Sequence, residues 1–463
     1  MTSGRHFFVA TINRDRLATL LRAEQELYIE RHPGSLALYR QAGHLFGGVP
    51  MTWMSAWSGG FPLYLDHAHA ARIVDVDGHT FVDFALGDTG AMAGHSPKAT
   101  IAAVQHRIGD LGGITTMLPT ADAEWVGAEL TRRFGLPLWS FTLSATDANR
   151  WAIRLARLVT GRPKILVFNY CYHGSVDEAF AIGRPDGTTV SREGNVAPPT
   201  PLDVTTRAVE FNDLAAVERA LAHGDVAAIL TEPALTNIGI VLPDPGFLEA
   251  LRALATKYGA LLMIDETHTI SVGPGGATEA WGLEPDIFII GKAIGGGIPS
   301  GAYGLSQEVA DRISAMAGPG GADIIDVGGV GGTLAGNAMS VAAMRATLEH
   351  VLTDASWPAM IELATLFTDD VAAVIAEHDL PWSVTQLGAR AEYRFTSPAP
   401  RTGSESHAGN DEELEEFLHL FCANRGVLIT PFHNMALMCP ETTRHDVDRH
   451  TAVFSEAVRT LVS

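Results

Sequence analysis

The sequence predicts an α/β fold, with a large domain built on a mostly parallel sheet flanked by helices and a smaller α+β domain. Short apolar runs at residues 261–264 and 286–290 have the length and composition of strands buried on both faces. Helical patterns at residues 148–159 and 246–258 alternate with such strands, which favours right-handed crossovers and parallel pairing. The 463 residues exceed one ordinary domain.

Three segments are expected along the chain. Residues 1–85 form an N-terminal arm and a hairpin segment that pack with the small domain, residues 86–345 form the large domain, and residues 346–463 form the small C-terminal domain. The patterns in the last segment predict a strand at 389–395, an exposed polar loop at 398–410, a helix at 412–425, a strand at 427–430 and a last helix from Asp446.

The N-terminal segment begins with leucines at helical spacing in residues 14–42, which predict a helical surface arm. A turn-rich connector at residues 47–54 follows and carries Trp53 and Met54. Two interpretations of these large side chains stay open: they line a pocket, or they only bury the arm. Alternating residues on either side of an Asp-Gly turn in residues 72–84 then predict a hairpin.

A strand at residues 141–144 leads into a helix that is predicted to begin at Ala145 and Thr146, with Thr146 as its N-cap. A helix N-terminus offers unpaired N–H groups and a positive dipole, so a phosphate has a binding place here. Plain helix capping without a ligand is the alternative. Further strands are expected at residues 165–168 and 227–231.

Asp265 and Lys292 each stand where a predicted buried strand ends. Ligands of open α/β sheets bind beyond the carboxyl ends of the strands, so an acid and an amine at these places can face one bound molecule. Pyridoxal phosphate requires such a pair, an amine for its aldehyde and a carboxylate for its ring nitrogen. The alternative is a solvated loop lysine and a helix-capping aspartate.

After Lys292 the pattern continues with a strand at 302–305, a helix at 307–316, glycine-rich sequence between Gly318 and Asn337, and a helix at 338–352. The glycine-rich sequence does not have the strand–GxxxxGK[ST]–helix context of a P-loop.

The balance of 32 basic and 53 acidic residues gives a net charge of −21, which disfavours nucleic acid and anionic membranes as partners. Three cysteines, an odd and sparse set, indicate a reducing compartment. Neither a signal peptide nor a membrane-spanning run is recognised, so a cytoplasmic protein is expected. No metal site is predicted.

Six short motifs occur in the order and at the spacing of one known family: Thr146 at a helix start, Tyr172-His173-Gly174, Glu232-Pro233, Asp265-Glu266, Gly291-Lys292 and Gly332-Thr333. With IDETHT and IIGKAIGGGIPSGAYG, they resemble the class III aminotransferases, which are fold type I pyridoxal-phosphate enzymes. The resemblance spans residues 47 to the C-terminus.

The resemblance implies a role for each of these positions. Lys292 forms the Schiff base and moves the proton, Asp265 holds the ring nitrogen protonated, and Tyr172 stacks on the ring. Thr333 reaches the cofactor phosphate of a neighbouring subunit, which implies a homodimer with shared active sites. The remaining expected cofactor-binding residues are Ala145, Thr146, His173, Glu232 and His268.

Several positions depart from the family pattern. Thr267-His268 replaces the usual pair beneath the ring, and His268 either donates to the phenolic oxygen of the cofactor or is a buried histidine paired with backbone. A gating glutamate is replaced by Asn237, and residues 430–435 contain no arginine. These features look closest to the glutamate-1-semialdehyde aminomutase and β-amino-acid aminotransferase branch, although the N-terminal arginine of that branch is absent near Met54.

A substrate carboxylate would then need another cation. Arg390, Glu392 and Arg394 alternate along one predicted strand and therefore share a face, so an arginine there could bind a carboxylate. A solvated face with internal ion pairs is the alternative. The expected pocket consists of Trp53, Met54, Arg390, Arg394 and His433.

From these features we expect an aminotransferase that moves an amino group from a primary amine or β-amino acid to a keto acid by a ping-pong mechanism. An intramolecular aminomutase of the glutamate-1-semialdehyde type is the second candidate. A non-catalytic protein that keeps the fold is the third, and the intact Asp265/Lys292 pair argues against it.

Overall fold

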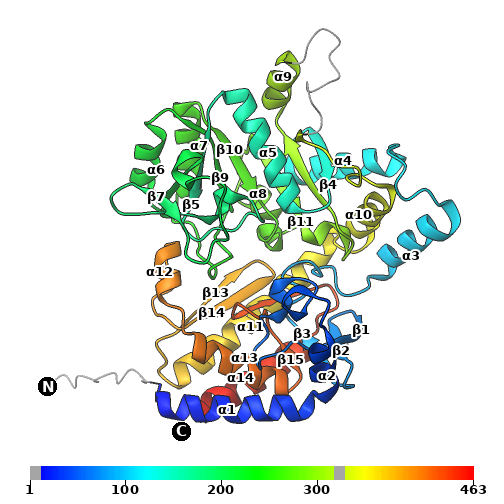
Figure 1. The fold of residues 1–463 in the computed structure, drawn as a ribbon, viewed down its shortest axis with the longest axis vertical. Coiled ribbons are helices and arrows are strands. Elements are labelled where there is room, and N and C mark those ends of the chain that lie inside the picture. Colours follow the sequence, from blue (N-terminus) through cyan, green and yellow to red (C-terminus); the bar gives the residue numbers. More distant parts are fainter. Residues whose placement is uncertain (1–11, 317–328, 463) are drawn as a thin grey trace.

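The computed structural model describes residues 12–316 and 329–462. Its upper part in Figure 1 is built on a seven-stranded sheet of order β4-β12-β11-β10-β9-β5-β8. All pairings are parallel except those of β12, which runs antiparallel to both neighbours, so the predicted mostly parallel sheet is confirmed. The strands are β4 (Leu138–Thr142), β5 (Lys164–Phe168), β8 (Thr206–Val209), β9 (Val226–Thr231), β10 (Leu261–Asp265), β11 (Ile287–Gly291) and β12 (Gly301–Leu305).

Helices cover both faces of this sheet. Tyr303 of β12 pairs with Ile289 of β11 and meets Trp151 of α5, with the ring centroids 6.5 Å apart. Phe288 points to the opposite face because side chains alternate along a strand, and it stacks on Phe134 of α4 at 4.4 Å. The helices of this part are α3 (Lys98–His106), α4 (Ala121–Phe134), α5 (Ala145–Thr160), α6 (Leu214–Leu221), α7 (Phe247–Tyr258), α8 (Gly276–Ala280), α9 (Gln307–Met316) and α10 (Ala338–His350).

The lower part in Figure 1 contains two smaller sheets of orders β1-β2-β3-β15 and β13-β14-β16. The predicted hairpin is β2 and β3, which pair antiparallel. The strands are β1 (Leu65–His69), β2 (Arg72–Asp75), β3 (Thr80–Asp83), β13 (Ser383–Leu387), β14 (Arg390–Arg394), β15 (Val427–Leu428) and β16 (Met435–Leu437). The helices are α1 (Arg14–Arg31), α2 (Pro33–Gln41), α11 (Trp357–Glu377), α12 (Gly403–Ala408), α13 (Glu412–Asn424) and α14 (Arg444–Val462).

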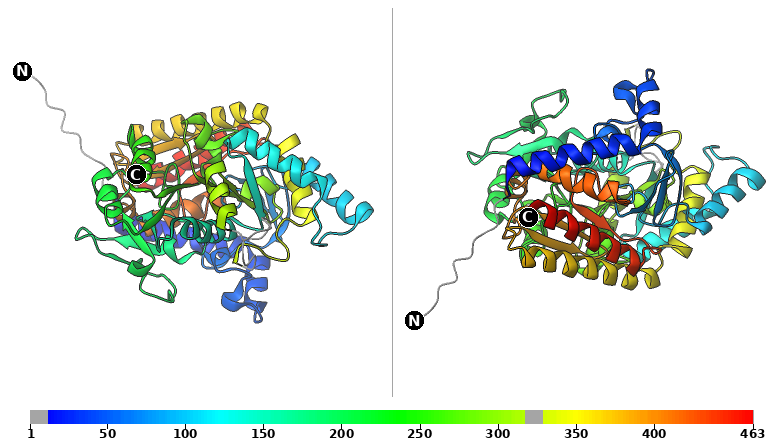
Figure 2. Two further views of the ribbon diagram at one scale, coloured as in Figure 1. Left: turned by 90° about the horizontal axis from the view of Figure 1, so that it is seen from above. Right: turned by 90° about the horizontal axis from the view of Figure 1, so that it is seen from below.

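The helix α1 is packed along the lower part. Leu17, Leu21 and Tyr28 are buried, and α1 lies beside α13 and α14 when the molecule is seen from below (Figure 2). Within residues 12–316 and 329–462, no helix is long and apolar enough to cross a membrane.

Three local expectations were wrong. The cap of α5 is Ser144, whose side chain accepts from the Asp147 N–H, and Thr146 lies inside the first turn. The segment expected to be an exposed loop at 398–410 contains α12, in which Ser406 is buried. A solvated face on β14 is excluded because every residue of that strand is buried. The part of the glycine-rich sequence from Gly318 to Gly328 lies outside the described residues.

Candidate active site

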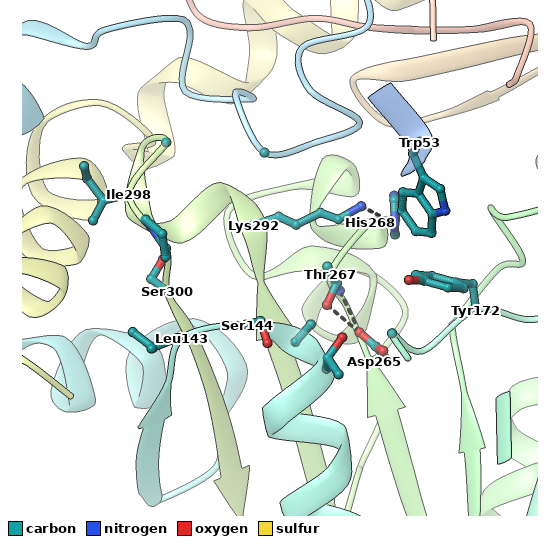
Figure 3. A pocket seen from close by; sticks show the side chains of 16 residues that line it. Trp53, Leu143, Ser144, Tyr172, Asp265, Thr267, His268, Lys292, Ile298 and Ser300 are labelled. Atoms are coloured by element: carbon teal, nitrogen blue, oxygen red, sulfur yellow. Dashed lines mark hydrogen bonds between the residues drawn. The ribbon is translucent and has the colours of Figure 1, made fainter. Parts of the chain in front are cut away.

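Asp265 and Lys292 lie at one edge of the large sheet. Asp265 ends β10 and Lys292 directly follows β11, and the two strands are parallel neighbours. A cavity of about 270 Å³ opens at this edge. Seven predicted residues line it: Trp53, Ala145, Thr146, Tyr172, Asp265, His268 and Lys292. The topology therefore brings together side chains from widely separated parts of the chain, as Figure 3 shows.

Asp265 is buried and strongly hydrogen-bonded. Its Oδ2 accepts from Asn149 Nδ2 at 2.8 Å and from His173 Nδ1 at 2.9 Å, while Oδ1 accepts from the N–H and hydroxyl of Thr267 at 3.0 and 2.6 Å. Burial opposes ionisation, but the bond and charge of His173, followed by the Thr267 and Asn149 bonds, lower the pKa of Asp265. The carboxylate is therefore anionic in the cavity wall.

Lys292 is held by Asp88, a residue that the sequence patterns did not single out. Lys292 Nζ donates to the Asp88 carboxylate at 2.7 Å and to its carbonyl at 2.9 Å, and lies 3.0 Å from His268 Nε2. Burial opposes ionisation of Asp88, yet the charge and hydrogen bond of Lys292, with a contribution from His433, keep its pKa well below the usual range. Burial and the adjacent Lys292 charge hold the pKa of His268 well below 6.5, so that histidine is neutral.

The start of α5 forms another part of the cavity wall. A Cβ at Gly291 would lie 2.9 Å from the Ala145 nitrogen, and one at Gly174 would lie 2.2 Å from Thr146 Oγ1. Thr146 Oγ1 accepts from the Ser175 N–H at 3.2 Å. Glycines at 174 and 291 therefore let two loops approach the helix N-terminus closely, where N–H groups and dipole favour an anion.

Aromatic side chains enclose the far side. The Tyr172 and Trp53 rings stand 5.4 Å apart, and Figure 3 shows both facing the cavity. A second cavity of about 360 Å³ shares Trp53, Tyr172 and His268 with the first and is also lined by Asp88, Arg192, His433 and Phe432. The two cavities are therefore neighbours separated by shared side chains.

Arg192 is a second residue missed in the sequence. It follows β7 (Thr189–Ser191), which pairs with β6 (Ala181–Gly183). Its guanidinium lies 4.9 Å from the Phe180 ring centroid and donates to the Cys171 carbonyl at 3.4 Å. Across the described ranges no carboxylate lies within ion-pair distance of Arg192, so its charge is available to the second cavity.

The other predicted residues take different positions. Glu232 is buried behind the cavity and accepts a hydrogen bond from Thr236, and burial raises its pKa to about 7. Arg390 is fully buried and donates to Ser271 and Thr89 at 3.0 and 2.7 Å, with its NH1 3.4 Å from His268 Nδ1. Burial lowers the pKa of Arg390 to about 10.

Arg394 and Met54 are not among the residues that line either cavity. Arg394 points to α12, where it donates to the Ser406 carbonyl at 2.6 Å and to Asn410. Met54 is exposed, and so is Thr333. His433 lies 3.7 Å from the Glu392 carboxylate, which raises its pKa although burial opposes this.

Comparison with known families matches residues 53–458 to "Aminotransferase class-III". The chain belongs to the class III aminotransferase family. A curated glutamate-1-semialdehyde 2,1-aminomutase from Anaeromyxobacter dehalogenans (strain 2CP-C) is 32% identical over 92% of this chain and 98% of its own length.

Solved structures of this family superpose over nearly the whole chain. A glutamate-1-semialdehyde-aminomutase lysine-to-alanine variant from Pseudomonas aeruginosa PAO1, in complex with PMP, has a TM-score of 0.93 at 48% identity and covers 97% of this chain and 99% of its own. A β-phenylalanine aminotransferase from Variovorax paradoxus has a TM-score of 0.84 at 26% identity, with 96% and 97% covered. These neighbours confirm the predicted fold type I and the predicted branch.

The same relatives correct the expected reaction. The sequence favoured an aminotransferase that uses a primary amine or β-amino acid and a keto acid. The relatives with 30–33% identity and the neighbours with 48–49% identity are glutamate-1-semialdehyde aminomutases, which overturns that expectation in favour of the second candidate. The replacement of the gating glutamate by Asn237 agrees with the aminomutase branch.

Pyridoxal phosphate is the cofactor of this family and the donor set fits it. An anionic Asp265 lines one side of the first cavity, and the Lys292 amine reaches the other side. The start of α5 offers N–H groups between them and the aromatic Tyr172 borders the cavity. The ring nitrogen of the cofactor would therefore meet Asp265, its aldehyde Lys292, and its phosphate the start of α5.

Proposed function

We propose that this protein is an aminomutase of the glutamate-1-semialdehyde type, which exchanges an amino group and a carbonyl oxygen between neighbouring carbons of one molecule. The observation that carries the proposal is the 48% identity over 97% of the chain to a glutamate-1-semialdehyde-aminomutase. Eight curated relatives of that description, at 30–33% identity, support it.

The substrate side of the site supports a single-substrate reaction. Asn237 donates its amide to the Tyr170 carbonyl at 3.1 Å, and is thereby fixed by backbone. The segment 430–435 presents His433, which faces Glu392, and no arginine. An enzyme that alternates between an amine donor and a keto acid has to admit two differently charged partners, whereas an aminomutase keeps one molecule bound throughout.

Bound pyridoxal phosphate supplies an electron-withdrawing ring. Asp265, kept anionic by His173, Asn149 and Thr267, would hold a proton at the ring nitrogen. Lys292 Nζ, positioned between Asp88 and His268, would carry protons between the two reacting carbons. His268 is neutral, so it can accept a hydrogen bond from Lys292 without placing a second positive charge beside the amine.

We assign the binding of the substrate carboxylate to Arg192. Glutamate 1-semialdehyde keeps one carboxylate, and Arg192 lines the second cavity together with Asp88, Tyr172 and Trp53. A partly desolvated guanidinium binds a carboxylate through two parallel N–H···O bonds. Arg390 is a weaker candidate, because its donors are already taken by Ser271 and Thr89.

We propose a homodimer in which Thr333 reaches the phosphate site of the partner subunit. The exposure of Thr333 in the single chain supports this, as does the family resemblance. We also propose a cytoplasmic location, which the three free, buried cysteines support.

The reaction can be tested with purified holoenzyme and glutamate 1-semialdehyde as the only substrate. The isomer with the amino group on carbon 1 should accumulate without any added keto acid. A parallel reaction with a primary amine and a keto acid should transfer amino groups far more slowly. Conversion that requires a stoichiometric keto acid would disprove the aminomutase assignment.

A further inference from the structure

Two histidines and an aspartate meet in the lower part of the molecule, away from the residues that line the two cavities. His32 joins the end of α1 to the start of α2, Asp75 ends β2, and His79 stands just before β3. One nitrogen or oxygen from each residue lies within 4.8 Å of the others. His32 and Asp75 are fully buried, whereas 27% of the His79 side chain is exposed.

The hydrogen bond of His32 fixes which of its nitrogens faces the cluster. Nδ1 lies 2.8 Å from the Tyr28 carbonyl, which can only accept, so Nδ1 carries the hydrogen. In the neutral ring Nε2 then presents a lone pair. That atom is buried, has no hydrogen-bond partner, and points at Asp75 Oδ2, which lies 3.5 Å away. Nε2 and Oδ2 are thus two acceptors that face each other. Oδ2 already has His79 Nδ1 within hydrogen-bond distance at 3.3 Å, whereas Nε2 has no partner, and a cation between the three atoms would supply one.

The Asp75 carboxylate is also held with one oxygen facing the cluster. Its Oδ1 accepts from the backbone N–H groups of Asp77 and His79 at 3.1 and 2.7 Å, which fixes the carboxylate in the hairpin turn. Its Oδ2 is turned toward the two imidazoles, with His79 Nδ1 at 3.3 Å. The second oxygen is therefore held in place by bonds that a ligand would not disturb.

We propose that His32 Nε2, Asp75 Oδ2 and His79 Nδ1 form a binding site for a divalent transition metal, with Zn²⁺ as the best match. Imidazole nitrogen and carboxylate oxygen bind Zn²⁺ at about 2.0–2.2 Å in tetrahedral geometry, which places neighbouring ligand atoms roughly 3.4 Å apart. Asp75 Oδ2 lies 3.5 Å from His32 Nε2 and 3.3 Å from His79 Nδ1, which agrees with such edges, and the two nitrogens lie within 4.8 Å of each other. A water molecule would complete the coordination on the side of the partly exposed His79.

The surroundings of the cluster are those of a metal ligand set. A ligating histidine usually donates its other N–H to a backbone carbonyl, as His32 does to Tyr28. The Tyr28 ring packs 4.4 Å from the His32 ring and Phe81 lies 6.3 Å away, so an apolar shell covers the buried side. The sequence did not suggest the site because His32 is far along the chain from the hairpin.

A bound metal would link two parts of the protein that are separate in the sequence. His32 belongs to the junction of α1 and α2, while Asp75 and His79 belong to the β2–β3 hairpin. The site would therefore stabilise the docking of the N-terminal helices without taking part in catalysis. The competing explanation is a proton shared by His32 and Asp75.

The test uses untagged holoenzyme, stripped with a chelator, with Zn²⁺ affinity measured by competition against a chromophoric chelator. We expect one Zn²⁺ per chain and a rise in unfolding temperature on binding. His79→Gln should weaken binding by about 100-fold or more, because it removes a direct ligand where loss of an outer-shell partner alone costs about 10–100-fold. The double variant His67→Gln/His69→Gln, on the exposed strand β1, is the matched control and should bind as the wild type does.

A spectrum of the wild-type protein with Co²⁺ complements the Zn²⁺ titration. Co²⁺ in the same site should give the intense visible difference spectrum of a four-coordinate ion with nitrogen and oxygen ligands. Equal affinity of wild type and His79→Gln, or loss of binding only in the His67/His69 double variant, would show surface binding and overturn the proposal. Failure of the wild type to bind Zn²⁺ or Co²⁺ would leave the shared proton as the explanation.

Discussion

Lys292 Nζ donates a 2.7 Å hydrogen bond to the carboxylate of Asp88, a residue 204 positions earlier in the chain. Asp88 and Thr89 both adopt positive φ, at 48° and 80°. The loop that carries them therefore holds a sparsely populated backbone conformation at the point where it meets the lysine. Asp88 balances the Lys292 charge and holds the amine at the cavity.

Replacing Lys292 with alanine should abolish turnover while the protein stays folded. The side chain would move protons, and its contacts to Asp88 and His268 lie at the cavity and not in the core, so activity should fall on the order of 10³-fold or more. Activity and circular dichroism are measured together, with Lys257→Ala, an exposed lysine on α7, as the control. Substantial turnover by Lys292→Ala would contradict its role.

Asp265→Asn should bind the cofactor but lose most of its chemistry. The amide cannot hold a positive ring nitrogen, and His173 loses the anion that now favours its protonated form. We expect turnover to fall about 10²–10³-fold, the usual cost of removing one electrostatic group in an active site. Cofactor affinity and turnover are determined on the same preparation, and equal losses in both would argue against this assignment.

Glu232 should make the stability of the cofactor-free protein fall as pH rises from about 4.5 to 7. Burial raises its pKa from 4.5 to about 7, so in that window the folded chain keeps a proton that the unfolded chain has lost. Its stabilisation is complete below pH 4.5 and is lost above pH 7, a difference of about 3 kcal/mol.

The variant Glu232→Gln keeps an acceptor for Thr236 but cannot titrate. Urea unfolding at pH 5 and pH 8 should therefore show a smaller loss of stability in the variant than in the wild type. Parallel pH dependence in the two proteins would mean that Glu232 is already ionised at pH 5.

Arg192→Gln should weaken ligands that carry a carboxylate. A hydrogen-bonded charge pair contributes about 1.5–3 kcal/mol, so 4-aminobutyrate should bind about 10–100-fold more weakly. Propylamine, which has no carboxylate, should bind as before. Titrations follow the absorbance of the bound cofactor, and Arg184→Gln, an exposed arginine in the same hairpin, is the control. Equal weakening of both ligands would refute carboxylate binding by Arg192.

Thr333→Val should lower cofactor affinity without changing the monomer fold. The substitution removes a hydroxyl and nearly preserves volume, so a phosphate contact across the dimer interface would be lost. Mass and cofactor occupancy are followed together during dilution, and dissociation should release cofactor. A monomer with full occupancy would place the whole phosphate site within one chain.

The sequence predicted the strands that carry Asp265 and Lys292 because buried parallel strands are short, apolar and bounded by polar residues. It did not reveal Asp88, whose loop follows no periodicity, although its position between two glycines in Gly87-Asp88-Thr89-Gly90 was a signal. Arg192 was missed because the strands of the β6–β7 hairpin have only three residues each, too few for a periodic pattern.

The interpretation of β14 shows a different limit of sequence patterns. A period of two correctly placed Arg390, Glu392 and Arg394 on one face, but periodicity does not tell which face meets solvent. The surrounding β13, β16 and α11 bury that strand. The division at residues 85/86 and 345/346 stays a prediction.

The reversed strand β12 also sets the order in which the enzyme can mature during its synthesis. β4, whose end leads into α5, is joined to the large sheet only through β12. A ribosome that has released β4 must therefore translate about 160 further residues, to Leu305, before that strand has its neighbour. The helix α5 also packs on β9 and β11, but the strand that leads into its N-terminus is fixed in the sheet only then. We therefore expect cofactor loading to be a late event in biosynthesis.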